Sequence, residues 1–223
     1  KETTDLGEDG ALVGRDCFRK QESFGRVGNQ ARAPAARMAQ QLEYRLGQLA
    51  AAIQCSLNPV AGVIGGVSSA PEDARRFIAG VQGAPDGWTF FLELFTRAAA
   101  SQPDIAFVCL GALTEIVKKV AQLGRQQQQQ QREDAVAATA ATAMLTPIRT
   151  VVLRWMQTHV AAGTLTAQPG FVRTKIAVLF ALLIKAQYPT TWSEPFAFLF
   201  SMVGSPSPHP ASAFEMFLCI MKA

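Results

Sequence analysis

The 223-residue sequence is poor in the groups that catalysis uses. It has two histidines, His159 and His209, and it contains no GxSxG, HExxH or Walker-type glycine loop. His159 falls in a helical pattern and His209 lies among prolines. Gly65 and Gly66 look like part of a glycine loop, but no Gly-Lys-Ser/Thr follows them, so they are expected to form a connection. The sequence therefore predicts a protein that is not an enzyme and that uses no cofactor.

Long apolar runs and paired cysteines are also missing. The longest apolar run, Ile176–Ile184, lies between Lys175 and Lys185. It is far shorter than the roughly 20 residues that cross a bilayer as a helix, so we expect a buried helix and no membrane insertion. The spacing of the four cysteines does not fit a zinc site or a redox pair, and it favours reduced thiols in a cytosolic or nuclear protein. They are Cys17, Cys55, Cys109 and Cys219.

The composition is that of a chain with a sizeable core. Apolar residues make up 49% and charged residues 17%. Lys and Arg number 21 against 17 Asp and Glu, and this mildly basic balance permits an anionic partner without indicating one. Residues 1–33 have glycines, mixed charge and no sustained period, and are expected to be a disordered leader. The first residue, Lys1, and the unfinished apolar pattern before Ala223 predict an internal stretch of a longer protein.

Apolar residues recur at steps of three and four along most of the chain, and no stretch alternates with period two. This pattern predicts an all-α protein of seven or eight amphipathic helices. The expected helices cover residues 36–56, 69–81, 88–95, 101–123, 146–163, 171–187, 191–203 and 214–221. The helix at 171–187 is apolar all round in its middle, so it must be covered on several sides.

Helix starts and stops are read from local motifs. Ser69–Glu72 and Thr191–Glu194 read as capping boxes, and Pro147 suits a first turn with Thr146 as its N-cap. The glutamine run 126–131 is expected to be an exposed loop or a solvated helix extension, followed by an alanine-rich stretch that extends the next helix. The stripe predicted to be buried before this run is Ile105, Cys109, Leu113, Ile116, Val120 and Leu123.

Helices in succession, joined by turns with proline and glycine, favour an α-solenoid of stacked helical pairs. A compact bundle is the alternative, because both architectures bury the same apolar stripes. No internal repeat of fixed period separates the two.

The segment from Phe171 to Trp192 resembles the amino-terminal exportin block of the importin-β superfamily. The features that carry this resemblance are Arg173-Thr174-Lys175, the apolar helix Val178–Ile184, Tyr188-Pro189, Trp192 and Phe196. Within the superfamily the chain is similar to the tRNA exportins (the exportin-T family), with weaker likeness at residues 57–59, 75–77, 85–94 and 145–157. It departs from the pattern at Thr174, where asparagine is usual, in the glutamine run, and in a longer first connection at residues 62–69.

The resemblance implies an α-α superhelix of HEAT-like repeats over residues 34–223, with the exportin block at 171–203 and a Gln-rich insertion near 126–133. It also implies a monomeric receptor that binds Ran in its GTP state, holds tRNA on its concave surface, meets nuclear pore components and shuttles between nucleus and cytoplasm. A receptor for another protein or RNA cargo, and a helical scaffold that binds neither Ran nor RNA, remain as alternatives.

Candidate contacts to Ran or tRNA are basic, because tRNA is held mainly through its phosphates. They are Lys118, Lys119, Arg125, Arg173, Lys175 and Lys185. A solvated face is the commoner explanation for Lys118 and Lys119. Arg173 and Lys175 could instead order a helix start or pair with Glu194.

The large aromatic side chains have a structural explanation. Trp88, Trp155, Trp192 and Phe196 are expected to pack in the core between repeats. His159 is expected to lie at a helix end without a switching role.

Overall fold

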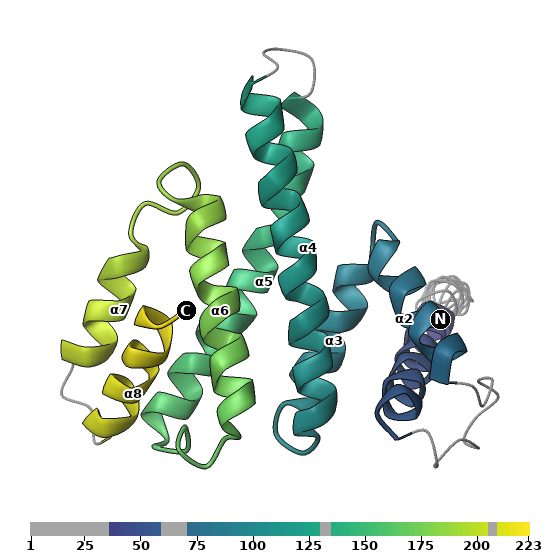
Figure 1. Ribbon diagram of the computed structural model, residues 1–223, viewed down its shortest axis with the longest axis horizontal. Helices are drawn as coiled ribbons and strands as arrows, with labels where there is room; N and C mark the ends of the chain where they lie inside the picture. Colours follow the sequence, from purple (N-terminus) through teal and green to yellow (C-terminus); the bar gives the residue numbers. More distant parts are fainter. Residues whose placement is uncertain (1–35, 59–70, 130–134, 205–208) are drawn as a thin grey trace, which may run out of the picture. The chain divides into compact units, whose positions relative to one another are not determined.

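The computed structural model describes residues 36–58, 71–129, 135–204 and 209–223 (Figure 1), with only the backbone at 124–129 and 135–142. The chain divides into two units, Lys1–Gly47 and Gln48–Ala223. In the first unit the described residues, 36–47, are helical, and the same helix runs on to residue 57. The expected leader at 1–33, the glycine connection, Cys17 and the first half of the Ser69–Glu72 motif lie outside the described residues.

The second unit holds the labelled helices. They are α2 (Pro71–Gly83), α3 (Gly87–Ala98), α4 (Pro103–Gln129), α5 (Ala135–Ala161), α6 (Gly170–Gln187), α7 (Pro195–Gly204) and α8 (Pro210–Met221). The described residues contain no strand, so the all-α prediction is confirmed. Four of these helices begin at proline, where the ring fixes a helical φ and the missing N–H costs no hydrogen bond.

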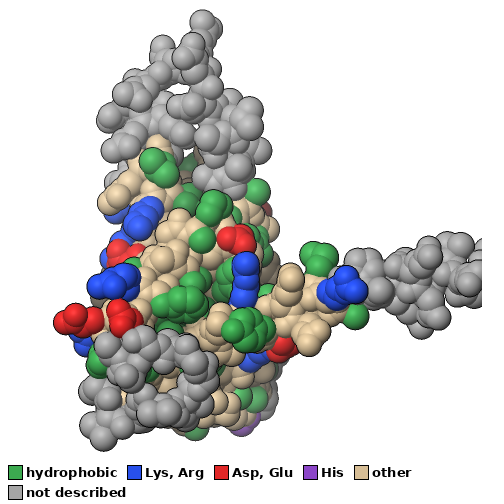
Figure 2. All heavy atoms as spheres, turned by 90° about the vertical axis from the view of Figure 1, so that its right-hand side faces the viewer, with side chains coloured by type: hydrophobic (Ala, Val, Ile, Leu, Met, Phe, Trp, Pro, Cys, Tyr) green, Lys and Arg blue, Asp and Glu red, His purple; other side chains and the backbone are tan. Residues whose placement is uncertain are grey.

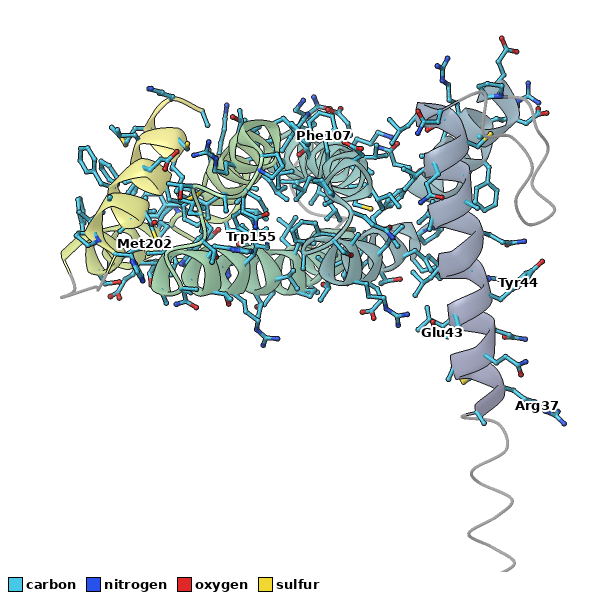
Figure 3. The ribbon with its side chains drawn as sticks, turned by 90° about the horizontal axis from the view of Figure 1, so that it is seen from below. Arg37, Glu43, Tyr44, Phe107, Trp155 and Met202 are labelled. Atoms are coloured by element: carbon cyan, nitrogen blue, oxygen red, sulfur yellow. The ribbon has the colours of Figure 1, made fainter. Side chains whose placement is uncertain are left out.

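The helices form layers in chain order. Helices α4, α6 and α8 pack successively against one another, α3 packs on α4 and α5, and α7 packs on α8. In Figure 3, α4 and α6 are seen nearly end-on. Helix α3 and the part of α5 around Trp155 form a second layer, which lies along one side of α4 and α6. Among the described helices, extensive packing joins only elements up to three apart in sequence. A closed bundle would also bring its first and last helices together, so this order is that of an α-α solenoid of the HEAT-like kind.

Helix α6 is the centre of this arrangement, because it packs against α4, α5 and α8. Its side chains at Val172, Ile176, Leu179, Phe180 and Leu183 are almost completely buried. Each such burial contributes about 1.5–3 kcal/mol relative to an exposed side chain. The prediction that this helix is covered on several sides is confirmed.

Helix α5 corrects one prediction. Pro147 lies inside the helix and not in its first turn, and Thr146 is no N-cap. A proline in a helix interior lacks an N–H and crowds the carbonyl four residues earlier, at a cost of about 3 kcal/mol. The alanine-rich residues before it favour helix strongly, and the early part of α5 runs beside the end of α4 in Figure 1. Local propensity and packing together outweigh the proline.

The second capping box is also wrong. The Thr191 hydroxyl and the Thr191 N–H both donate to the carbonyl of Gln187, at 3.3 and 2.9 Å. They therefore close the end of α6 and do not start α7, which begins at Pro195. Pro195, whose missing N–H would have no intrahelical partner anyway, takes the first helical position of α7 instead.

The buried stripes are shorter than predicted. Ile105, Cys109, Leu113 and Ile116 are buried, but Leu123 is 52% exposed. The glutamine run begins as a helix extension, since α4 continues to Gln129. In α2 only Ala74 is buried, so this helix contributes little to the core. A helical period indicates which side of a helix is apolar, but the neighbouring elements decide how much of that side is covered.

Candidate nucleic-acid and partner interface

Helices α4 and α6 meet through an aromatic pair and a lysine near their first turns. The rings of Phe107 on α4 and Phe171 on α6 stand edge to face, with centroids 5.4 Å apart. The Lys175 ammonium lies 5.3 Å from the centroid of the Phe107 ring, which is within cation–π range. Both helices begin at the lower edge of Figure 1 and run upward side by side, so they are parallel.

Two further lysines lie on the same side of this helix pair. Lys118 follows Phe107 by three helical turns, about 16 Å along the axis, and Lys185 follows Phe171 by about four turns. Whole turns return a side chain to nearly the same direction, so both lysines project on the side marked by the aromatic pair. Both are exposed. We call the surface formed by Phe107, Lys118, Phe171, Lys175 and Lys185 the α4–α6 face.

The structure thus brings together three of the six candidate residues. Lys118 also forms an exposed ion pair with Glu115, with Nζ 2.8 Å from Oε1. Lys119 is exposed as well, but it projects about 100° further round α4. The backbone of Arg125 belongs to α4, but the structure does not describe its side chain.

Arg173 has a different environment. It forms an ion pair with Glu215 of α8, and its side chain is only 19% exposed. Its Nε is buried without a hydrogen-bond partner. The carboxylate that pairs with Arg173 is therefore Glu215 and not Glu194, and the pair ties α6 to α8. The sequence did not point to Glu215, because this residue lies on a different helix from Arg173 and no local motif connects the two.

A second cluster holds the turn between α6 and α7. Arg149 donates from Nη1 to Oε1 of the fully buried Gln187 at 3.2 Å and to the carbonyl of Thr191 at 3.4 Å. Its guanidinium carbon lies 4.9 Å from the centre of the Trp192 ring, which stands edge-on to Phe180. The Tyr188–Pro189 peptide bond in this turn is cis. The cluster fixes the turn to α5 and α6, while Gln187 Nε2 is buried without a hydrogen-bond partner.

The aromatic predictions divide. Trp155 is buried and Trp192 packs on Phe180, as expected, while Trp88 is half-buried. Phe196 is 48% exposed and contacts the Tyr188 ring at the surface, so its assignment to the core is wrong.

Among the described residues, His159 and Cys109 have side chains whose pKa values are shifted by burial. His159 lies in the last turn of α5, as predicted, with its Nδ1 2.8 Å from the Thr164 hydroxyl, and burial lowers its pKa. Burial raises the pKa of the Cys109 thiol to about 12, and Cys55, Cys109 and Cys219 are all free. The described side chains include no group of three that could hold a metal ion. None of the described helices combines the length and apolar character that a bilayer crossing requires.

The positive charge is concentrated in the second part of the chain. Residues 135–223 contain six Lys and Arg against two Asp and Glu, which equals the net charge of +4 of the whole chain. Figure 2 shows another face, where acidic and basic side chains alternate. There α2 forms local pairs such as Arg76 with Asp73, at 3.2 Å. An excess of cations thus goes with the part of the chain that contains α6.

The segment that contains the Arg173–Glu215 pair matches a known protein family. Residues 169–223 match the family of exportin 1-like proteins. The match covers α6, α7 and α8, about a quarter of the chain. It supports a relation to the importin-β and exportin superfamily, whose members are nuclear transport receptors that shuttle between nucleus and cytoplasm and are not enzymes. It does not distinguish the tRNA exportins from other members. No curated protein and no solved structure matches the chain.

Proposed function

We propose that the protein is a nuclear export receptor for tRNA, which it binds together with Ran in the GTP state and releases in the cytoplasm. The observation that carries this proposal is the exportin 1-like match on α6–α8. The tRNA assignment is supported by the weaker likeness of residues 57–59, 75–77, 85–94 and 145–157 to the tRNA exportins.

Stacked helical pairs suit such a function. Each pair contacts mainly its neighbours, so small shifts at successive contacts can change the curvature of the whole stack. If tRNA and Ran both favour the same curvature, each tightens the binding of the other, and the coupling is reciprocal. Loss of GTP-bound Ran then releases the tRNA without any bond being broken in the cargo. The receptor acts as a monomer that meets nuclear pore components in transit.

The α4–α6 face is the tRNA contact in this proposal. Lys118 and Lys185 are exposed there, and Lys175 lies near the aromatic pair. Lys119 adds an exposed cation on a neighbouring side of α4. Ammonium groups that contact phosphates release counterions, so binding weakens steeply with salt and reads few bases. Arg173 contributes to the fold through Glu215 and is not part of this contact.

The test is a binding measurement on the full chain with Ran loaded with GTP or with GDP, each with and without tRNA. We expect binding to the GTP form only, and at least fivefold tighter binding when tRNA is present. Equal binding of both forms, or none, would favour the helical scaffold. Tightening by another protein or RNA cargo in place of tRNA would retain the receptor and overturn the tRNA assignment.

A further inference from the structure

Arg149 on α5 is a half-buried cation that has no counterion among the described residues. Its guanidinium carbon lies 4.9 Å from the centre of the Trp192 ring, and it forms no ion pair with a described carboxylate. Glu194, the acid of the turn between α6 and α7, is exposed and is not its partner. A charge withdrawn from water is normally paired, because its lost hydration is otherwise uncompensated. This part of the fold therefore holds a positive charge that lacks its partner.

The hydrogen bonds of Arg149 leave one edge of its guanidinium unused. Both bonds, to the Gln187 side chain and to the Thr191 carbonyl, come from Nη1. The N–H donors on Nε and Nη2 remain, and they find no acceptor among the described residues. Neither nitrogen is among the buried atoms that lack a partner, so solvent reaches both. Two parallel N–H groups of this kind match the two oxygens of a carboxylate.

The contacts around Arg149 hold its guanidinium in place. Gln187 is completely buried, and its Oε1 accepts from Nη1 at 3.2 Å. The Trp192 ring, on which the guanidinium lies, is itself held by an edge-on contact with Phe180. A side chain that is already ordered loses little conformational entropy on binding, so this arrangement favours a ligand. Gln187 Nε2, buried without an acceptor, shows that the fold alone does not satisfy all polar groups of the cluster.

The surroundings of Arg149 favour a single carboxylate over a polyanion. Nucleic acids are held by several cations that contact successive phosphates. On α6, Lys185 projects about 160° away from Gln187 and belongs to the α4–α6 face. On α5, Arg154 projects about 140° away from Arg149, so neither cation faces the cluster. The turn at residues 188–194 contains no Lys or Arg.

An apolar surface belongs to the same turn. Tyr188 and Phe196 are 49% and 48% exposed, and their rings meet edge to face with centroids 5.9 Å apart. They lie four residues before and four residues after Trp192, which is half-buried. Tyrosine, tryptophan and arginine are the residues that most often anchor contacts between proteins. The cluster therefore has the composition of a small protein-binding site.

We propose that Arg149 and Trp192 form a docking site for a partner protein segment in which an aspartate or glutamate lies next to an apolar side chain. The carboxylate accepts hydrogen bonds from Nε and Nη2 of Arg149, and the apolar side chain packs on Tyr188 and Phe196. The site supplies the counterion that the chain itself lacks. It is separate from the α4–α6 face and does not depend on tRNA or Ran binding.

A titration of the full chain with two acetylated dipeptide amides, followed by NMR, tests the proposal. The probe is acetyl-Phe-Glu-amide, and acetyl-Phe-Gln-amide is the neutral control of nearly the same shape. The signals observed are the indole N–H of Trp192 and the Nε–H of Arg149. We expect the glutamate peptide to shift both signals saturably and to bind about tenfold more tightly than the glutamine peptide.

Variants separate the two parts of the site. Arg149→Lys retains the charge but not the paired N–H donors, and should weaken binding of the glutamate peptide about tenfold. Phe196→Ser should weaken both peptides, whereas Arg154→Gln, an exposed cation on the same helix, should change neither. Because Arg149 also holds the turn, circular dichroism checks that its variant is folded, and the peptide pair tests the unsubstituted protein in any case.

Equal affinity of the two peptides, or no shift with either, would overturn the proposal. A stronger response to inorganic phosphate than to the glutamate peptide would also overturn it, because the site would then select a phosphate ligand. Undiminished binding to a folded Arg149→Lys variant would refute the paired contact to the carboxylate.

Discussion

Replacing Glu215 by alanine should destabilise the chain because it leaves the Arg173 guanidinium charged and without its partner. The two side chains are only 19% and 33% exposed, and Arg173 Nε is already buried without a hydrogen bond. The remaining guanidinium would therefore be poorly solvated. The pair also joins two consecutive helices of the layer, so its loss weakens the packing of α8 on α6.

The expected magnitude lies between those of exposed and buried ion pairs. Exposed pairs contribute about 0.2–1 kcal/mol, whereas removal of one partner of a buried pair costs about 3–5 kcal/mol. For the partly buried Arg173–Glu215 pair we expect a loss of about 2 kcal/mol. In a chain of this size this corresponds to a decrease of about 4–8 °C in the melting temperature.

The assay is urea unfolding followed by circular dichroism, supported by calorimetry. Glu115→Ala is the matched control, because it removes the acid of the exposed Lys118–Glu115 pair, whose side chains are 46% and 53% exposed. It should change the free energy of unfolding by less than about 0.5 kcal/mol. The swapped variant, Arg173→Glu with Glu215→Arg, should recover part of the loss. Equal effects of Glu215→Ala and Glu115→Ala would refute the structural role of the Arg173–Glu215 pair.

Three further predictions concern single residues. Burial lowers the pKa of His159, so the unfolded chain binds more protons at this residue than the folded chain does. The free energy of unfolding should therefore fall as the pH drops through about 6.5. The urea midpoints measured at pH 7.5 and at pH 5.8 should differ less in His159→Gln than in the unsubstituted protein. Because burial raises its pKa to about 12, Cys109 should resist alkylation by iodoacetamide at pH 8 in the folded protein, while the half-buried Cys55 and Cys219 react. Peptide mapping of the alkylated protein measures this difference. Gly163 has a φ of +65°, and an added Cβ would lie 2.6 Å from a histidine ring, so Gly163→Ala should lose about 1–3 kcal/mol in thermal unfolding. The matched control for this substitution is Gly111→Ala, which has no atom within 4 Å of the new Cβ and should lose no stability in the same assay.

Helix α6 shows what the sequence is able to predict. Its apolar residues surround the helix and its charges lie towards the ends, so both its limits and its coverage on several sides follow from the pattern. The succession of helices along the chain was predictable from the period of the apolar residues and from the proline and glycine turns between them. Pro147 was misplaced because proline in a first turn is the common case, and only the packing of α5 beside α4 makes the interior position tolerable.

The candidate site was less accessible to sequence reasoning. The periodicity indicates that Lys118 and Lys185 are on polar sides of their helices, but it does not indicate that α4 and α6 are neighbours. Arg173 matches the exportin pattern equally well whether it binds a partner or pairs internally, and Glu215 lies on another helix. The exposure of Phe196 could not be predicted either, because an apolar row looks the same whether or not another element covers it.

The central claim, that lysines of the α4–α6 face bind tRNA phosphates, is tested most directly by the salt dependence of tRNA binding in the full chain. The account predicts that Lys118→Gln with Lys185→Gln lowers the slope of log K against log salt by about 2, with little change in stability. The control is Arg154→Gln, an exposed cation on α5, in the other layer, and it should leave the slope unchanged. An unchanged slope in the double variant, or an equal decrease in Arg154→Gln, would contradict the claim.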